Sequence, residues 1–324
     1  MYEIKRWGKK ILDFCFAPFT FLAAKWYKFI ISKGIFFFPV SRSIFMKVGV
    51  LPVIDHYYYP MINPKKYLTK SLRDDRYLPG IDLKDKSQLE LLQQFNYNEE
   101  LSAFPYTKLP GNDNKYYYNN GMFGPGDSEI LYSLIRYFKP RRIIEVGSGH
   151  STLMSLNGIA ANKNEDLAYY CDLICIEPYE IPWLEKLEIK LERIIVEKLD
   201  PSYFQVLEEN DILFIDSSHV IRPQGDVLFE YLQLLPVIKK GVIVHVHDIF
   251  TPKDYLDHWV LESHNMWNEQ YLLEGFLSCN SSFEILCSLN YLFYHHREAI
   301  LSKCPVLREN TKLEPRSFWL RKIC

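Results

Sequence analysis

From about residue 140 onward, short apolar runs rich in β-branched residues alternate with longer amphipathic segments. The apolar runs lie at 142–146, 173–177, 193–199, 211–216 and 241–247. The helical segments between them lie at 152–160, 182–191, 202–209 and 227–238. Strands that are apolar throughout and alternate with helices are typical of a parallel sheet covered on both faces. The pattern therefore predicts an α/β fold with a doubly wound, mostly parallel sheet.

Two later apolar runs, at 282–294 and 317–322, have the lengths expected of an antiparallel edge hairpin. With them the predicted sheet has about seven strands. The preceding region reads as a helical and irregular extension, with one helix expected around 87–95. We therefore predict three domains: an apolar and basic segment at 1–40, an aromatic-rich extension at 41–120 that packs on the core, and a ligand-binding domain at 121–324.

The first forty residues differ in character from the rest of the chain. Basic residues at 5–10 precede an apolar stretch at 11–24, which Asp13 and Pro18 interrupt. The stretch is shorter than the roughly 20 apolar residues of a spanning helix. In outline it resembles a secretory signal peptide, but lysines follow it. Two interpretations stay open: a helix lying on a membrane with its basic residues at the headgroups, and a helix packed on the protein's own domain.

Composition narrows the class of protein. Hydrophobic residues make up 48% and charged residues 24%, which is typical of a folded globular chain. The net charge of −2 and the lack of a basic patch argue against a nucleic-acid partner. The seven cysteines include no CxxC pair, which argues against disulfides or zinc and favours a cytoplasmic protein. The tyrosine clusters at 56–60 and 115–121 fit either packed loops or a platform for a sugar ring.

The clearest chemical signal follows the first predicted strand, where the chain reads EVGSGHST. Glycines let the backbone turn tightly and approach a ligand, and the amides of the next helix then face that ligand. The segment lacks the third glycine of the dinucleotide fingerprint and the lysine of a phosphate-binding loop. Glu177 ends the second strand, where an acidic residue can hold the ribose hydroxyls of an adenosine group. Together these features predict a nucleotide-like ligand.

Polar residues also end the fourth and fifth predicted strands. Asp216 and His219 follow one, and His247 and Asp248 follow the other. Ligands of a doubly wound sheet bind outside the carboxyl ends of its strands, so these side chains are expected to converge. They would supply ligands for a divalent metal or a general base that deprotonates a hydroxyl. His245, inside the strand, is interpreted as a core residue.

The order EVGSG-x-ST, IEP, DILFIDSSHV, GVIVHVHDIF and WNEQYLL resembles the class I S-adenosylmethionine-dependent methyltransferases. It is most similar to bacterial enzymes of polysaccharide and secondary-metabolite pathways. The resemblance runs from about Val50 to the end, and includes HYYYP, LPGIDL, NNGMFGPGD and SFWLRK. It implies a Rossmann-like sheet and S-adenosylmethionine as cofactor, but it does not identify the methyl acceptor.

The resemblance also implies cofactor contacts residue by residue. Glu145, Gly147 and Gly149 would hold the amino-acid end of S-adenosylmethionine. Ser151 would support that pocket, and Glu177 would hold the ribose. These residues form the expected cofactor site, together with the aspartate that follows the fourth strand.

That aspartate, Asp216, would contact the cofactor amine or, as in metal-dependent relatives, a magnesium ion. Those relatives carry an acidic pair after the fifth strand, where this chain has His247 and Asp248. A divalent-metal site of Asp216, His247 and Asp248 is therefore one interpretation, and a metal-free site is the other.

The resulting hypothesis is an O-methyltransferase acting on a glycan, glycolipid or secondary-metabolite hydroxyl, in the cytoplasm or at the inner membrane face. Because the sulfonium methyl is already activated, the protein must align the acceptor and remove its proton. His219 is the first candidate base and Asp248 the second. Tyr57, Tyr58 and Trp267 are candidates for the acceptor pocket. The alternatives are an NAD-dependent oxidoreductase on the same sheet and a non-catalytic, membrane-attached scaffold.

Overall fold

The computed structural model describes residues 2–50, 53–56, 58–111 and 114–324. Contacts divide the chain into two compact units, Met1–Thr69 and Lys70–Cys324. Residues 70–120, expected to form an irregular extension, belong by their contacts to the same unit as the sheet. The helices of the first unit are α1 (Tyr2–Lys33), η1 (Ile35–Phe37), α2 (Pro39–Val48) and α3 (Pro64–Tyr67).

The second unit is built on a seven-stranded sheet of order β3-β2-β1-β4-β5-β7-β6. The strands β1 to β5 are parallel, and β7 runs antiparallel to both β5 and β6. This confirms the predicted α/β fold with a doubly wound, mostly parallel sheet and an antiparallel edge hairpin. Its strands are β1 (Arg142–Val146), β2 (Asp172–Ile176), β3 (Lys190–Glu192), β4 (Ile212–Ile215), β5 (Ile243–Val246), β6 (Phe283–Ser288) and β7 (Phe318–Lys322).

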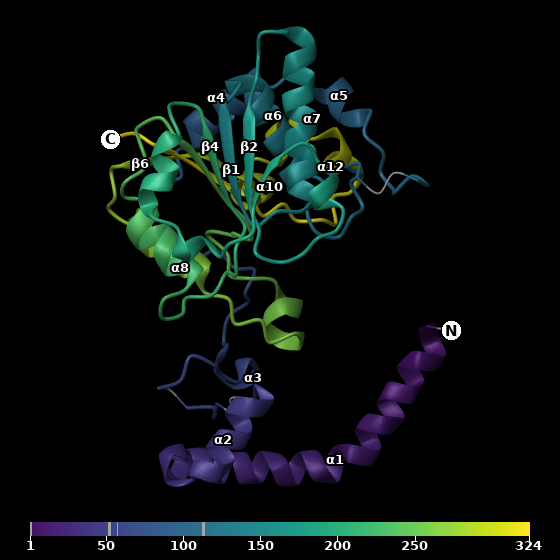
Figure 1. The fold of residues 1–324 in the computed structure, drawn as a ribbon, viewed down its shortest axis with the longest axis vertical. Helices are drawn as coiled ribbons and strands as arrows, with labels where there is room; N and C mark the ends of the chain where they lie inside the picture. Colours follow the sequence, from purple (N-terminus) through teal and green to yellow (C-terminus); the bar gives the residue numbers. More distant parts are fainter. Residues whose placement is uncertain (1, 51–52, 57, 112–113) are drawn as a thin grey trace. The chain divides into compact units, whose positions relative to one another are not determined.

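Helices cover both faces of this sheet, with α6 and α7 on one side and α8 on the other (Figure 1). The helices of this unit are α4 (Asp85–Gln94), α5 (Asn98–Ser102), α6 (Asp127–Phe138), α7 (His150–Glu165), η2 (Leu184–Lys186), η3 (Val196–Lys198), η4 (Pro201–Val206), α8 (Asp226–Phe229), η5 (Glu230–Leu234), η6 (His258–Glu262), α9 (Glu269–Leu277), α10 (Leu289–His295), α11 (Arg297–Lys303) and α12 (Pro305–Glu309). The helix expected at 87–95 is α4.

Alternation along the strands divides the core into two clusters. In β1, Ile143 faces the cluster that contains residues of α6 and α7, and Ile144 faces the cluster that contains residues of α8 and α9. Successive strand side chains point to opposite faces of a sheet, so a strand buried on both faces must be apolar throughout. This is the physical reason for the continuous apolar runs in the sequence.

Three sequence-based expectations are wrong in detail. The third strand is β3, which overlaps the end of the segment expected to be a helix at 182–191, while the run 193–199 forms no strand and contains the short helix η3. An edge strand needs only one protected face, so β3 need not be apolar throughout. The apolar run 193–199 instead packs on the core cluster on the α8 side of the sheet, through Ile194 and Val196. The helix expected at 202–209 is the shorter η4. The run 282–294 is a strand only to Ser288 and continues as α10.

The register of the sheet aligns the ends of its central strands. Val146 of β1 pairs with Ile176 of β2 and with Ile215 of β4, which in turn pairs with Val246 of β5. The next residues along the chain are Glu177, Gly147, Asp216 and His247, in that spatial order. The strand order changes direction at β1, and a doubly wound sheet opens a ligand crevice at such a point. The register therefore brings the predicted site residues to one edge.

Candidate functional site

The turn after β1 requires glycine. Gly147 has a φ of +78°, and a Cβ added to it would lie 1.9 Å from the backbone oxygen of Asp216. The ends of β1 and β4 therefore touch at this point, and no side chain fits between them. Gly149, the residue before α7, is different because a Cβ added there meets nothing within 4 Å. Its Cα faces open space, in which a ligand can approach the backbone.

Glu145 stabilises this turn from below rather than lining the cavity. Its carboxylate accepts hydrogen bonds from the hydroxyls of Ser151, at 2.5 Å, and Thr152, at 2.6 Å. The Thr152 hydroxyl in turn accepts the Gly149 amide at 3.0 Å. Burial raises the pKa of Glu145 to about 7, although the hydroxyl donors oppose that shift. Through these contacts Glu145 fastens α7 to β1, and the cofactor contact expected of it stays a prediction.

Glu177, which follows β2, lines the cavity and is held in place by backbone donors. Its Oε2 accepts the Ser148 amide at 3.1 Å, and its Oε1 accepts the Tyr179 amide at 2.8 Å. The side chain is therefore fixed beside the glycine turn, with its carboxylate oxygens available to further donors. A ribose diol is one such pair of donors.

Two hollows meet at this edge of the sheet and share Gly147, Glu177 and Asp216. The smaller, of about 260 Å³, has an apolar floor that includes Val146, Ile176, Ile195 and Val196. The larger, of about 630 Å³, extends over the ends of β4 and β5. Its lining residues beyond the shared ones include Phe123, Ser148, Gly149, His150, Ser151, Trp183, His219, His247, Asp248, Trp259, Trp267 and Arg316.

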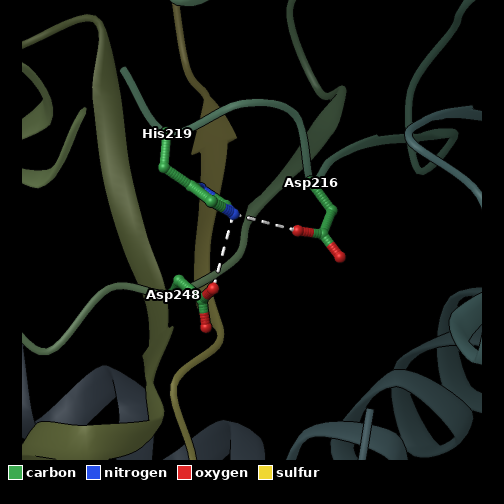
Figure 2. Close-up of side chains that lie close together, drawn as sticks. All are labelled: Asp216, His219 and Asp248. Carbon is green, nitrogen blue, oxygen red and sulfur yellow. Dashed lines mark ion pairs between the residues drawn. The ribbon is translucent and has the colours of Figure 1, made fainter. Parts of the chain in front are cut away.

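Asp216, His219 and Asp248 point toward one another in the larger cavity (Figure 2). The Nε2 atom of His219 lies 3.4 Å from Oδ1 of Asp216 and 3.4 Å from Oδ2 of Asp248. His219 has a φ of +61° and Asp248 one of +57°, values that non-glycine residues rarely adopt. Such backbone strain persists only where the surroundings enforce it, and it is often found at functional sites.

A fourth residue, Glu269 of α9, holds the other side of the imidazole. Its Oε2 lies 2.8 Å from Nδ1 of His219, and its Oε1 accepts the Tyr231 hydroxyl at 3.1 Å. Burial alone would lower the pKa of His219, but the contacts with Asp216 and Glu269 and the charge of Asp248 raise it well above its ordinary value. Glu269 lies within the WNEQYLL motif, which was the only sequence signal for it.

His245, within β5, and His247, directly after it, differ in their surroundings. His245 is fully buried and stacks on Phe214 with 3.7 Å between ring centroids, as expected of a core residue. Burial lowers its pKa well below the ordinary value. His247 lies 3.6 Å from Oδ1 of Asp248 and borders the cavity. Within the described part of the chain, neither ring nitrogen of His247 has a hydrogen-bond partner.

The donor atoms of Asp216, His219 and Asp248 all lie within 4.8 Å of one another, a spacing that suits a metal ion. This set differs from the predicted one in containing His219 in place of His247, whose Nε2 atom lies 3.6 Å from Oδ1 of Asp248. Oδ1 of Asp248 accepts no hydrogen bond from the described residues, although the Nε atom of Arg316 is 3.0 Å away. Oxygen and imidazole donors of this kind fit divalent cations.

An aromatic wall faces these charged groups. The rings of Trp259 and Trp267 are 4.8 Å apart, and Trp267 is 4.7 Å from the His219 ring. The Arg316 guanidinium lies 5.3 Å from the Trp259 ring and donates to the Met122 carbonyl at 2.8 Å. Sequence reasoning named Trp267 but missed Trp259 and Arg316.

Of the other aromatic residues considered for the acceptor pocket, Tyr58 is exposed in the first unit. Tyr57 lies outside the described residues.

Comparisons with known proteins agree with this geometry. A family described as "Methyltransferase domain" matches residues 144–249, which contain the glycine turn after β1 and the ends of β2, β4 and β5. An uncharacterized protein of Archaeoglobus fulgidus is 31% identical over 184 residues, covering 53% of this chain and 80% of that protein.

Solved structures similar to this chain include a putative O-methyltransferase from Klebsiella pneumoniae, at 14% identity and a TM-score of 0.35, covering 74% of this chain and 90% of that one. Another is the O-methyltransferase TomG from Streptomyces achromogenes, involved in tomaymycin synthesis and solved with S-adenosylmethionine. It is 13% identical with a TM-score of 0.37, covering 75% of this chain and 92% of that one. Similarity at this distance says nothing about the substrate. On the family match over residues 144–249 and the order of the sheet together, the chain contains a methyltransferase domain of the class I, S-adenosylmethionine-dependent kind.

Proposed function

We propose that this enzyme transfers the methyl group of S-adenosylmethionine to a hydroxyl of a glycan, glycolipid or other ring-bearing acceptor. The observation that carries the proposal is the position of the His219 imidazole. One nitrogen is fixed by Glu269, and the other faces the cavity between two carboxylates. An alcohol has a high pKa, so its methylation needs a group that takes the hydroxyl proton.

The cofactor is proposed to bind across the shared edge of the two hollows. Gly147, Gly149 and the Ser151 region would receive its amino-acid end, and Glu177 would accept its ribose hydroxyls. The apolar hollow that contains Ile176 and Val196 would receive the adenine. The open space beyond Gly149 and the buried Ser148 hydroxyl, which has no hydrogen-bond partner among the described residues, support this placement.

His219 is proposed as the general base. Glu269 holds Nδ1, so Nε2 is the nitrogen that faces an acceptor hydroxyl. As that hydroxyl loses its proton to Nε2, its oxygen forms a bond to the methyl carbon, and the carbon–sulfur bond breaks. The products are a methyl ether and S-adenosylhomocysteine, with the proton held on His219. Asp248, the second candidate base, has its Oδ2 atom 3.4 Å from the same Nε2.

A divalent cation such as magnesium is proposed beside the base, held by Asp216 and Asp248 with His247 nearby. Among the described residues, Oδ1 of Asp248 and the two ring nitrogens of His247 make no hydrogen bond, which supports this ligand set, although the same Asp248 oxygen forms an ion pair with Arg316. When bound, such an ion would lower the pKa of a coordinated acceptor hydroxyl. His219 would then remain available as the proton acceptor.

The acceptor is proposed to stack on Trp259 and Trp267, whose rings offer flat apolar faces next to the base. Aromatic rings pack well on the apolar faces of sugars and other ring systems, and Arg316 adds a cation at the same wall. The proposed location is the cytoplasm, at the inner membrane face, where S-adenosylmethionine and lipid-linked acceptors are both accessible.

The experiment is a release assay for S-adenosylhomocysteine with a panel of sugars, nucleotide sugars, glycolipid headgroups, phenols and amines. The account expects product from a hydroxyl acceptor, and expects exhaustive EDTA treatment to lower the rate until magnesium is restored. Product formation only with amine acceptors would contradict the proposed O-methylation. Full activity after chelation would contradict the proposed metal site but not the proposed O-methylation.

A further inference from the structure

The first unit contains a pair of helices whose apolar side chains are mostly exposed. We call residues 7–50, which comprise most of α1 together with η1 and α2, the apolar hairpin. Phe14 is 83% exposed, Phe37 70% and Val40 73%. Soluble proteins rarely expose large continuous apolar patches unless the surface binds a partner or a membrane. The proposed methylation chemistry makes no use of this segment.

The hairpin is held together by a few contacts of its own. Tyr27 of α1 packs edge-on against Phe45 of α2, with 5.0 Å between ring centroids. Ile30 is fully buried, and Phe45 is 6% exposed. Phe38, between the helices, contacts the rings of Trp26 and Phe29. These contacts hold the hairpin together and leave most of its other apolar side chains exposed.

The exposed side chains surround α1 instead of forming one stripe. Successive residues of a helix are about 100° apart, so Phe14 and Phe21 point in nearly the same direction, whereas Phe16 and Phe19 point to roughly the opposite side of the helix. All four are more than half exposed. A groove on a partner protein covers one stripe of a helix. A lipid phase can cover a helix on several sides at once. The distribution therefore favours a bilayer as the partner.

The charge of the hairpin points to the kind of lipid. Among residues 7–50, seven are Lys or Arg and one is acidic, whereas the whole chain has a formal net charge of −2. The basic side chains, from Lys9 to Lys47, are all exposed. Lysine and arginine next to a membrane are attracted to anionic headgroups. Exposed tryptophans such as Trp7 and Trp26 favour the interfacial region.

Among the described residues, α1 from Trp7 to Lys33 is long and apolar enough, by length and composition, to cross a membrane. Its uncharged stretch, however, runs only from Phe14 to Ala24, which is about 17 Å of helix against a hydrocarbon core of about 30 Å. Pro18 interrupts that stretch, and Lys25 and Lys28 follow it. A spanning position would draw both lysines toward the hydrocarbon.

We propose that the apolar hairpin is a monotopic anchor, which lies in one leaflet of an anionic bilayer and keeps its lysines at the headgroups. The proposal is independent of the methylated acceptor. It assigns membrane binding to the first unit.

The test is co-flotation of the full chain with vesicles of phosphatidylcholine alone, or of phosphatidylcholine with phosphatidylglycerol. We expect binding to the anionic vesicles, weakening as salt is raised. The triple variant Phe14→Glu, Phe19→Glu and Leu22→Glu should bind at least tenfold more weakly. Reversing Lys25 and Lys28 to glutamate should weaken binding about fivefold or more for each lysine.

The matched control places the same substitutions on the second unit. The triple variant Leu167→Glu, Leu232→Glu and Leu313→Glu also alters exposed apolar side chains and should bind vesicles like the unaltered chain. S-adenosylhomocysteine binding within threefold of the unaltered chain reports that each variant is folded. A full chain that floats with neither kind of vesicle overturns the proposal. The proposal is also overturned if the triple variant Phe14→Glu, Phe19→Glu and Leu22→Glu binds vesicles like the unaltered chain and changes only the oligomeric state, from dimer to monomer.

The position in the bilayer is tested by labelling Gly8→Cys, whose added side chain meets nothing within 4 Å. The background replaces Cys15, Cys171, Cys279 and Cys324, the cysteines that are not buried, with serine. A reagent that cannot cross membranes, added outside preformed vesicles, should label the bound protein fully. Labelling that begins only after detergent is added would show a spanning helix and overturn the monotopic anchor.

Discussion

The two ends of the larger cavity are built in opposite ways. At the end of β1, glycines and backbone amides form the surface. The carboxylate of Glu145 there accepts hydrogen bonds from hydroxyls six and seven residues away in the chain. At the ends of β4 and β5, charged side chains surround one imidazole, and Glu269 comes from fifty residues beyond His219. The first end offers shape to a cofactor. The second offers a base and possible metal ligands. Mutations at the two ends should therefore affect cofactor binding and methyl transfer separately.

The largest expected effect is at the charged end. Replacing His219 with alanine removes the proposed base, so the methyl-transfer rate should fall by about 10²- to 10⁴-fold. The measurement is single-turnover transfer at saturating cofactor and acceptor. His258→Ala, which alters an exposed histidine of η6, is the control and should keep the rate. A His219→Ala rate within threefold of the unaltered enzyme would mean that another group takes the proton.

The next effect distinguishes the two glycines of the other end. Gly147→Ala places a Cβ against a backbone oxygen at a positive φ, so we expect a loss of about 3 kcal/mol or more of folding stability. Gly149→Ala places its Cβ in open space and should leave the thermal midpoint nearly unchanged while weakening cofactor binding about tenfold. Thermal unfolding and calorimetry on the two variants make the comparison. Equal loss of stability in both would refute the distinct roles of these glycines.

A smaller effect concerns the buried Glu145. Its folded-state pKa, about 7, lies above the ordinary value of 4.5, so the folded protein holds the proton more tightly. Its contribution to stability is therefore complete below about pH 4.5 and is lost as the pH rises toward 7, by up to about 3 kcal/mol. Glu145→Gln removes this dependence. Its thermal midpoint should gain several degrees on the unaltered protein between pH 5 and pH 8. A constant difference across that range would contradict the raised pKa.

The smallest predicted effect concerns Glu269, which contacts the base but not the acceptor. Glu269→Gln keeps the shape of the side chain and removes its charge, so kcat should fall about tenfold with little change in the acceptor KM. The lower basicity of His219 should also move the acid limb of the kcat profile to lower pH. Tyr231→Phe removes one donor to Glu269 but leaves its charge, so it should move the acid limb little, and toward higher pH. A fall in kcat with an unmoved pH profile would indicate only a packing role.

Much of the fold was predictable because it follows from local pattern. The apolar strands revealed the sheet, and the rule that parallel strands end at one edge brought Asp216, His219 and Asp248 together before their distances were known. The apolar pattern failed for β3, because a short edge strand with an exposed Lys190 and a half-buried Glu192 leaves no continuous apolar run. The run after it is apolar for a different reason, namely packing against the α8-side core.

The surroundings of the site were harder to predict. Glu269 of α9 reaches His219, and Arg316, from the loop before β7, reaches Asp248. No spacing in the sequence links these two residues to the strand ends. Glu145 was expected to touch the cofactor because it precedes the glycines. The alternation of β1 instead turns its side chain into the core below α7, where its carboxylate accepts hydrogen bonds from the hydroxyls of Ser151 and Thr152.

The most direct test of the division between the two ends is calorimetric titration of S-adenosylhomocysteine into a pair of variants. Glu177→Ala removes a cofactor-end carboxylate, and His219→Ala removes the proposed base. The account predicts that Glu177→Ala weakens binding at least tenfold, whereas His219→Ala binds within threefold of the unaltered enzyme. Weakened binding in His219→Ala together with unchanged binding in Glu177→Ala would contradict the account.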